Sequence, residues 1–238
     1  TIQDKTTLLV CAYDTRGLNF ALYELAERIN AQSLPALYQP CQERPLLKRR
    51  GVVHFLPHEE LKKGWSFSPT SWQSYFDQLI RKRFNTLTLV FDAPSLISTL
   101  LYLVDLPEHP EVHPSLFSTP SRKNLETLQQ WVERATEAGI DLYLGFWNFP
   151  GNPALAETNC GLNQDNLESY LYLAFKQIIF SCPELKGLEV KFTGSPLAPD
   201  FFSNTLGRAI AETGNSLTLK LDSGQTTPEL LSLLGERE

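Results

Sequence analysis

Two aspartates stand where apolar runs give way to turns. Asp92 ends the run in "LVFDAP", and Asp222 ends the run in "LKLDSG". Two carboxyl groups held about 5–9.5 Å apart can hydrolyse a glycosidic bond, one as an acid and the other as a nucleophile or base. Asp before Ala-Pro or Ser-Gly also caps turns, and this is its commoner role. Asp92 and Asp222 are therefore catalytic candidates, with turn capping as the favoured alternative.

Aromatic and polar side chains follow other apolar runs. Trp147 and Asn148 end the run in "YLGFWN", His54 lies near the end of "GVVHFLP", and Trp65 stands in the segment after it. An indole can pack on the apolar face of a sugar ring, while amides and imidazoles bind its hydroxyls. The alternation of side chains along a strand leaves open whether Trp147 faces a pocket or the core. These four residues are candidates for substrate binding.

The stretch "EVKFTGSPLAPD" contributes Lys191 and Ser195 as further substrate-binding candidates. A lysine near the end of a strand can bind the carboxylate of an acidic sugar, and it can equally neutralise a nearby acid such as Glu189. The sequence leaves both interpretations of Lys191 open.

The histidines and glycines predict neither a metal site nor a cofactor. His54 and His58 are four residues apart, but the Phe-Leu-Pro between them is extended, so they lack the helical spacing of a zinc motif. His109 and His113 lie in the proline-punctuated loop "PEHPEVHP", where a helix is not expected. No glycine-rich phosphate-binding turn follows any apolar run.

The elements that must position these candidates alternate between strands and amphipathic helices. Residues 93–120 are expected to form a long loop, and Trp72 and Trp131 are expected in the helical core. Ser68 or Thr70 is the expected cap of the first helix after Gly51, and Ser121 and Gly139 are expected to bound the second. A strand at 6–12 and a helix at 15–29 precede a connector at 31–48. From Gly51 onward, strands are expected at 51–57, 85–92, 140–149, 187–194 and 216–222, with helices at 68–84, 121–139, 163–183, 198–214 and 226–235.

Such alternation predicts an α/β fold with a covered parallel sheet. Five units are too few to close a (β/α)₈ barrel of about 250 residues, so an open doubly wound sheet and a barrel lacking three units are both possible. The missing nucleotide-binding turn and the absence of any methionine, including an initial one, favour a partial barrel.

Composition narrows the class of partner. The chain has 238 residues, 42% of them hydrophobic, which is enough for one sizeable core. A net charge of −6 with short basic runs argues against nucleic-acid binding, and no apolar run is long enough to span a bilayer. The four cysteines are scattered, so neither a zinc site nor a disulfide framework is expected, and Cys11 is expected in the core.

Several stretches, taken together, resemble a known family. "DTRGLNFALYELAERI" is similar to the last strand–helix passage of the small α/β domain that precedes the barrel in alpha-glucuronidases and beta-hexosaminidases. "RRGVVHF", followed by "WQSYFDQLIRKRFNTLTLVF", resembles their first barrel strand, first helix and second strand. "NLETLQQWVERATEAGIDLYLGFWN" resembles their third unit. The resemblance is closest to uncharacterised relatives of these glycosidases and extends over residues 6–234.

This resemblance implies a division at residue 47, with the end of an accessory domain in 1–47 and the first five units of a (β/α)₈ barrel in 48–238. It implies a carbohydrate substrate at the carboxyl ends of the strands, hydrolysis by carboxylates, and a secreted or periplasmic location. In hexosaminidases an Asp-Glu pair follows strand four, where this chain has Thr193, Gly194 and Ser195. A non-catalytic carbohydrate-binding relative is therefore the alternative function. The oligomeric state is left undetermined.

Overall fold

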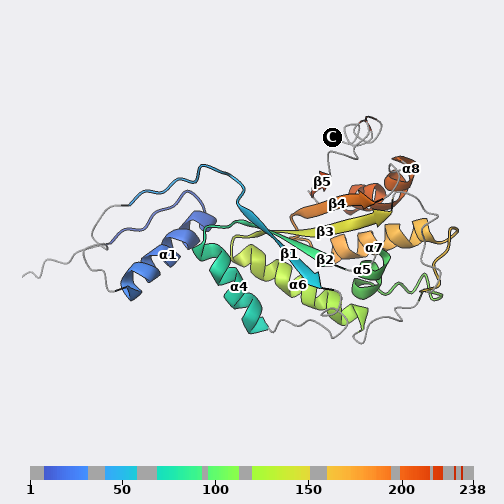
Figure 1. The fold of residues 1–238 in the computed structure, drawn as a ribbon, viewed down its shortest axis with the longest axis horizontal. Coiled ribbons are helices and arrows are strands. Elements are labelled where there is room, and N and C mark those ends of the chain that lie inside the picture. The colour runs from blue at the N-terminus through green and yellow to red at the C-terminus, as the bar shows by residue number, and fades with distance from the viewer. Residues whose placement is uncertain are drawn as a thin grey trace, which may run out of the picture.

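The computed structural model of the chain is a twisted parallel sheet with helices along one face (Figure 1). It describes residues 8–31, 41–57, 69–92, 96–112, 120–150, 160–193, 199–214 and 217–221, together with Pro228 and Ser232.

Five strands pair in the order in which they occur along the chain, and every neighbouring pair is parallel. Right-handed crossovers that always step in the same direction place every connecting helix on the same face of a sheet. A doubly wound sheet instead reverses its order and carries helices on both faces. The order therefore confirms the partial barrel of about five units. The strands are β1 (Gly51–Pro57), β2 (Thr86–Asp92), β3 (Asp141–Pro150), β4 (Gly187–Thr193) and β5 (Thr218–Leu221).

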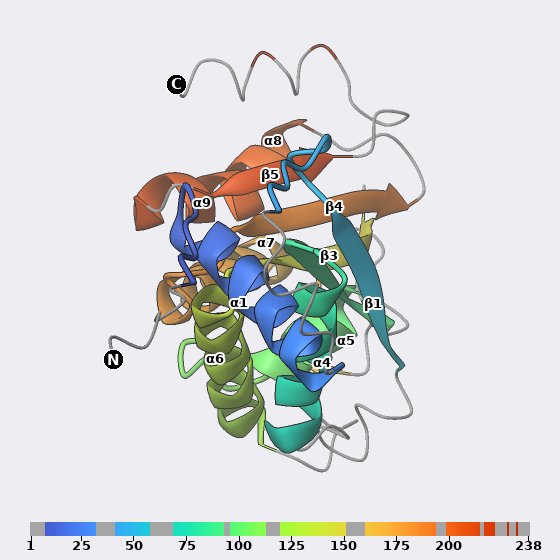
Figure 2. The ribbon, with the colours of Figure 1, turned by 90° about the vertical axis from the view of Figure 1, so that its left-hand side faces the viewer.

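The crossover helices lie on one side of the strands, as Figure 2 shows. Between Pro199 and Thr213 three short pieces follow one another, the middle one being a π-helical turn. None of the described helices combines the length and the apolar character needed to cross a bilayer. The helices of the barrel are α4 (Pro69–Arg81), α5 (Leu96–Leu103), α6 (Ser121–Glu137), α7 (Leu167–Ser181), α8 (Pro199–Phe202), η3 (Ser203–Gly207) and α9 (Arg208–Thr213).

The core fills the space between the sheet and these helices. Trp72 of α4 and Trp131 of α6 are both buried, with ring centroids 3.9 Å apart, which confirms their expected place in the core. Every second strand residue joins them, because side chains alternate between the faces of a sheet. These core residues include Leu56, Leu87, Leu89, Leu142, Leu144, Leu188 and Val190.

The segment expected to be a long loop contains α5, all eight residues of which are buried. Ser121, expected to cap α6, is instead its first residue, and Pro120 holds the cap position. The Ser121 hydroxyl donates to the carbonyl oxygen of Leu101 (2.7 Å), and the Asn124 amide donates to that of Tyr102 (2.8 Å). The carbonyls at the end of a helix lack partners within it, and α6 supplies partners for two of them.

The first helix of the expected barrel also begins differently. Thr70 is the second residue of α4 and so does not cap it, while Ser68 lies outside the described residues. Gly139 follows the end of α6 with a φ of +75°, as expected of a terminating glycine.

Helix α1 (Thr15–Asn30) is attached to the barrel by polar contacts as well as by Phe20 and Tyr23, which pack against the core. Arg16 pairs with Asp141 (2.8 Å), and Arg83 pairs with Glu24 (2.7 Å). The Tyr23 hydroxyl donates to Asp77 (2.6 Å). Arg83 and Asp141 lie just before β2 and at the start of β3, so these contacts hold α1 at the amino ends of the strands.

Helix α1 turns Phe20 and Tyr23 toward the barrel, so Leu18, Leu22 and Ile29 are exposed. The amino-terminal part departs from expectation in two respects. Residues 8–12 form no strand, since no described strand lies beside them to pair with. Cys11, expected in the core, is exposed in this irregular segment. The division at residue 47 stays a prediction.

Replacing Trp72 by alanine should lower the free energy of unfolding by about 3–5 kcal/mol, because it leaves a cavity between α4 and α6. The matched control is Phe180→Ala on α7, where the ring is 79% exposed, so the loss should stay within about 0.5 kcal/mol. Urea denaturation followed by circular dichroism measures both. Equal losses would contradict the burial of Trp72 between the two helices.

Candidate functional site

The face of the sheet that turns away from the helices carries aromatic and charged side chains. In β1 this inner face is open, with Val53 45% exposed and Phe55 46% exposed. In a (β/α)₈ barrel the corresponding face points to the barrel axis, and the functional groups gather at the carboxyl ends of the strands. The candidate site therefore lies on this face.

Glu189 of β4 forms the centre of the lower part of the inner face, the part nearer the amino ends of the strands. Its Oε2 accepts a hydrogen bond from the Thr88 hydroxyl of β2 (3.3 Å) and lies 3.5 Å from the Lys220 ammonium of β5. The Lys220 nitrogen also lies 3.6 Å from the centroid of the Tyr143 ring of β3. The carboxylate thus links three strands from the inside of the sheet, with a cation–π contact to the strand between them.

Trp147 of β3 forms the centre of the upper part, nearer the carboxyl ends. The Lys191 ammonium lies 3.4 Å from the centroid of its ring. Phe55 packs on it edge-to-face, with centroids 4.8 Å apart. The indole nitrogen of Trp147 is buried and has no hydrogen-bond partner among the described residues. Trp147 therefore faces the inside of the barrel, which answers the question that alternation left open.

Gly145 of β3 allows side chains of β2 to pack closely against the backbone of β3 on this face. A Cβ at this position would lie 2.5 Å from Cγ2 of Val90, closer than packed carbon atoms come. The strand register then shifts between Phe146 and Phe149, where β3 pairs with β4. Such irregularities re-aim side chains at the rims of barrels. Gly145 and the shift together set the position of Trp147.

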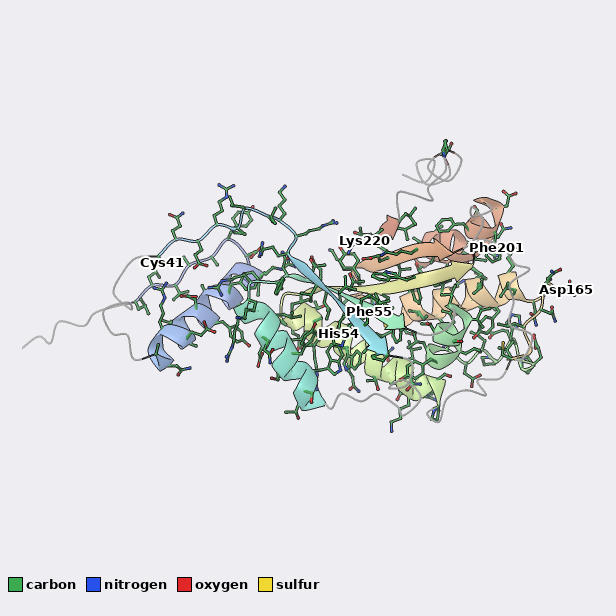
Figure 3. All side chains as sticks on the ribbon, viewed as in Figure 1. Cys41, His54, Phe55, Asp165, Phe201 and Lys220 are labelled. Atoms are coloured by element: carbon green, nitrogen blue, oxygen red, sulfur yellow. The ribbon has the colours of Figure 1, made fainter. Side chains whose placement is uncertain are left out.

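His54 lies on the opposite face from Phe55, its neighbour in β1 (Figure 3). Its ring contacts Trp72 (5.7 Å between centroids) and Tyr75 (5.2 Å) of α4. It also borders a cavity of about 440 Å³ along α4. The structure therefore separates His54 from Trp147 and Lys191.

The structure brings together two of the residues expected in one site, Trp147 and Lys191. Lys191 makes its described contact with Trp147, and it is Lys220 that neutralises Glu189. Asp92 and Asn148 lie at the carboxyl-terminal parts of β2 and β3, and their side chains are outside the description. Trp65, Ser195 and Asp222 fall outside the described residues, so their roles stay predictions.

Sequence reasoning did not select Phe55, Tyr143 or Lys220. The alternation of side chains between the two faces of each strand could have found them. Once Leu142, Leu144 and Phe146 are assigned to the core of β3, Tyr143 and Trp147 must face the other side. The parallel register then aligns Lys220 with Glu189 across β4 and β5.

The inner face offers aromatic surface and two ammonium groups, and its described carboxylate, Glu189, is already paired. This combination suits a polar ligand with an apolar face and oxygen acceptors. Among the described residues no group of three or more His, Cys, Asp or Glu side chains could hold a metal ion.

Comparison with known proteins identifies the fold through solved structures and not through sequence. No family model and no curated protein matches the sequence. Among solved structures, a GH138 enzyme targeting pectin rhamnogalacturonan II aligns with a TM-score of 0.61 at 17% identity, over 84% of this chain. The chain has a glycoside hydrolase-like fold. It spans about a quarter (26%) of the length of that enzyme.

A second solved structure, GH5_18 from Streptomyces cattleya in complex with GlcNAc, aligns with a TM-score of 0.45 at 13% identity. The alignment covers 73% of this chain and 44% of the GH5_18 chain.

The pairing of Glu189 with Lys220 predicts a measurable coupling. In a double-mutant cycle of Glu189→Gln and Lys220→Met, the coupling in the free energy of unfolding should be about 1 kcal/mol or more, because both groups are largely shielded. The glutamine introduced in place of Glu189 still accepts from Thr88, so the cycle isolates the charge.

The matched control for this cycle is the exposed pair Arg122–Glu126 on α6, changed to Met and Gln. Water screens this pair, so its coupling should stay below about 0.5 kcal/mol. Equal couplings in the two cycles would mean that the inner-face pair is only a surface contact.

Proposed function

We propose that this chain is the carbohydrate-binding part of a glycoside hydrolase-like protein that acts on a poly- or oligosaccharide. The observation that carries the proposal is the platform of Phe55, Trp147 and Lys191 at the carboxyl-terminal part of the inner face. The shared fold with a GH138 enzyme supports it, because barrel enzymes bind their substrates at this end of the strands.

The chemistry of the platform suits a sugar ring. A pyranose can pack its C–H face on the indole of Trp147, and an acceptor oxygen can satisfy the indole N–H that now lacks a partner among the described residues. An unpaired buried donor costs about 1–3 kcal/mol, which a ligand oxygen would recover.

Lys191 now covers the ring and must move aside when a sugar enters. Its flexible stem permits this movement, and the lost cation–π contact costs about 0.5–2 kcal/mol. The displaced ammonium can then bind an oxygen of the same sugar. A uronic acid would suit it best, since its carboxylate replaces the electrostatic contact that the ring provided.

The substrate class follows from two sources. The GH138 enzyme targets pectin rhamnogalacturonan II, which makes this polysaccharide the first probe to test. The resemblance to alpha-glucuronidases and beta-hexosaminidases adds acidic and amino sugars as further probes.

Hydrolysis would require two carboxylates, for which we propose Asp92, the last residue of β2, and Asp222, which follows β5 in the sequence. A non-catalytic carbohydrate-binding protein is the second candidate. The observation favouring it is that Glu189, the described carboxylate beside the platform, already holds the Lys220 ammonium and the Thr88 hydroxyl.

Replacing Trp147 by alanine should weaken binding of rhamnogalacturonan II fragments at least tenfold, since aromatic packing at such a site contributes on the order of 1–2 kcal/mol. Isothermal titration calorimetry measures the affinity. The control Phe180→Ala removes an exposed ring on the outer side of α7 and should leave the affinity unchanged. Equal affinities of the Trp147→Ala variant and the unaltered chain would remove the platform from binding.

Replacing Asp92 or Asp222 by asparagine should reduce hydrolysis by at least about a hundredfold in a protein that contains the whole barrel, because asparagine can act neither as nucleophile nor as acid. Reducing-sugar release measures turnover, and affinity measured in parallel separates catalysis from binding. Unchanged turnover in both variants would remove Asp92 and Asp222 from the mechanism, and an unaltered protein that binds fragments without turnover would favour the non-catalytic candidate.

A further inference from the structure

A serine, a histidine and a glutamate form a hydrogen-bonded series outside the sheet face. Nε2 of His109 lies 3.3 Å from the Ser169 hydroxyl oxygen, and Nδ1 lies 3.0 Å from Oε1 of Glu111. His109 and Glu111 belong to the loop after α5, and Ser169 lies in the first turn of α7. His109 and Ser169 are 60 positions apart, so the fold, and not local sequence, brings them together.

The hydrogen bonds define the roles of the two imidazole nitrogens. A carboxylate can only accept, so Nδ1 of His109 carries the proton that it shares with Glu111. In the neutral ring Nε2 is then an acceptor, and the Ser169 hydroxyl donates to it. This is the arrangement that activates a serine, because the base that takes the hydroxyl proton is oriented by an acid behind it.

Each of the three groups is held in place by its surroundings. His109 is nearly buried and packs edge-to-face on Tyr170, with ring centroids 5.7 Å apart. Glu111 also accepts from the Asn166 amide (3.0 Å), and the hydrogen bond from His109 keeps the pKa of its carboxyl below the usual range. The Asn166 amide also reaches the carbonyl of Gly161 (3.0 Å), so the loop is fixed to the segment before α7. The hydroxyl of Ser169, by contrast, belongs to an exposed residue.

The amino end of α7 supplies the remaining requirement for acyl transfer. Side chains of a helix tilt toward its amino end, so the Ser169 oxygen lies on the side where the first backbone N–H groups point. The N–H groups of Leu167 and Tyr170 bond to the carbonyls of Asn163 and Asn166, whereas for those of Glu168 and Ser169 no acceptor occurs among the described residues. These donors and the positive end of the helix can stabilise a developing oxyanion.

The location permits access by a large substrate. Asp165, which shortly precedes α7, lies at the end of the molecule toward which β4 points (Figure 3). The loops at this end follow the carboxyl ends of the strands, where barrel proteins place their functional groups. An ester on a large molecule can therefore reach Ser169.

We propose that Ser169, His109 and Glu111 form a serine hydrolase site for carboxylic esters. The Ser169 oxygen attacks the ester carbonyl carbon while its proton passes to Nε2 of His109. The tetrahedral adduct then breaks its bond to the alcohol oxygen, which leaves with that proton. Water repeats the sequence on the acyl-serine and releases the carboxylic acid. The proposal does not depend on carbohydrate binding at the inner face.

A fluorophosphonate probe tests the nucleophile directly, because it phosphonylates activated serines. In the unaltered chain it should label Ser169, as located by peptide mass spectrometry, and p-nitrophenyl acetate should be hydrolysed. Ser169→Ala should abolish both signals. His109→Gln should lower both rates by about 10²–10⁴-fold, the usual contribution of a general base. Ser74→Ala, an exposed helical serine on α4, is the matched control and should change neither rate.

Glu111→Gln keeps the shape of the acid and removes its charge, so it decides the proposal should His109→Gln fail to fold. It should slow both reactions at least about tenfold while circular dichroism stays unchanged. A folded, unlabelled parent chain would overturn the proposal and leave the three residues as a structural clamp between the loop and α7. Equal labelling of the parent chain and of the His109→Gln and Glu111→Gln variants would overturn it as well.

Discussion

The fixed direction in which the five parallel strands follow one another is the constraint on which the rest of this chain depends. Because each crossover steps the same way, the helices cover one face of the sheet and no described helix covers the other. Every strand must then divide its side chains between an apolar layer and an inner face. The core takes Leu56, Leu144 and Val190, and the inner face takes Phe55, Trp147 and Lys191.

An inner face of this kind must satisfy its charges without a helix to shield them. Here the two lysines lie over aromatic rings of β3, and the carboxylate lies between a hydroxyl and an ammonium. Gly187 is part of this arrangement, because a Cβ there would clash with the Tyr143 ring and with the backbone of β5. A small residue in β4 lets Tyr143 of β3 meet Lys220 of β5 across the strand between them. The inner face is therefore specified by glycines as much as by charged residues.

Much of the fold could be predicted because its elements carry simple periodic patterns. The strand expected at 51–57 and the start of α1 agree with the structure to the residue, and α6 begins one residue before the start that its expected cap implied. Helix α5 was not predicted because all its residues are buried, so its sequence lacks the polar stripe that marks an amphipathic helix. Helix α1 shows the opposite case: Leu18, Leu22 and Ile29 are exposed. Phe20 and Tyr23 pack toward the barrel instead, and ion pairs join Arg16 to Asp141 and Glu24 to Arg83.

The candidate sites were less predictable, because they depend on which face of the sheet each strand residue occupies and on contacts between distant segments. His54 and Phe55 are neighbours in sequence and lie on opposite faces, so the type of a residue at a strand end does not tell which face it serves. The only function that the sequence suggests for His109 is metal binding with His113, and the loop that holds them lacks the helical spacing of a metal motif. The partners of His109 are a carboxylate two residues away and a serine on α7, and the second of these depends on how the loop packs.

These two sites divide the chemistry of the chain in a physically sensible way. The inner face is rich in donors and aromatic surface, and its described carboxylate is neutralised, so it is equipped to hold a polar ligand rather than to transfer a proton to it. The loop and α7 have the converse properties: an oriented imidazole, an exposed hydroxyl and helix-end donors. A barrel separates its crossover segments from its inner face, which lets one chain carry both arrangements without either disturbing the other. If the chain binds a polymer through Trp147 and Lys191, that binding would also raise the local concentration of any ester the polymer carries near Ser169.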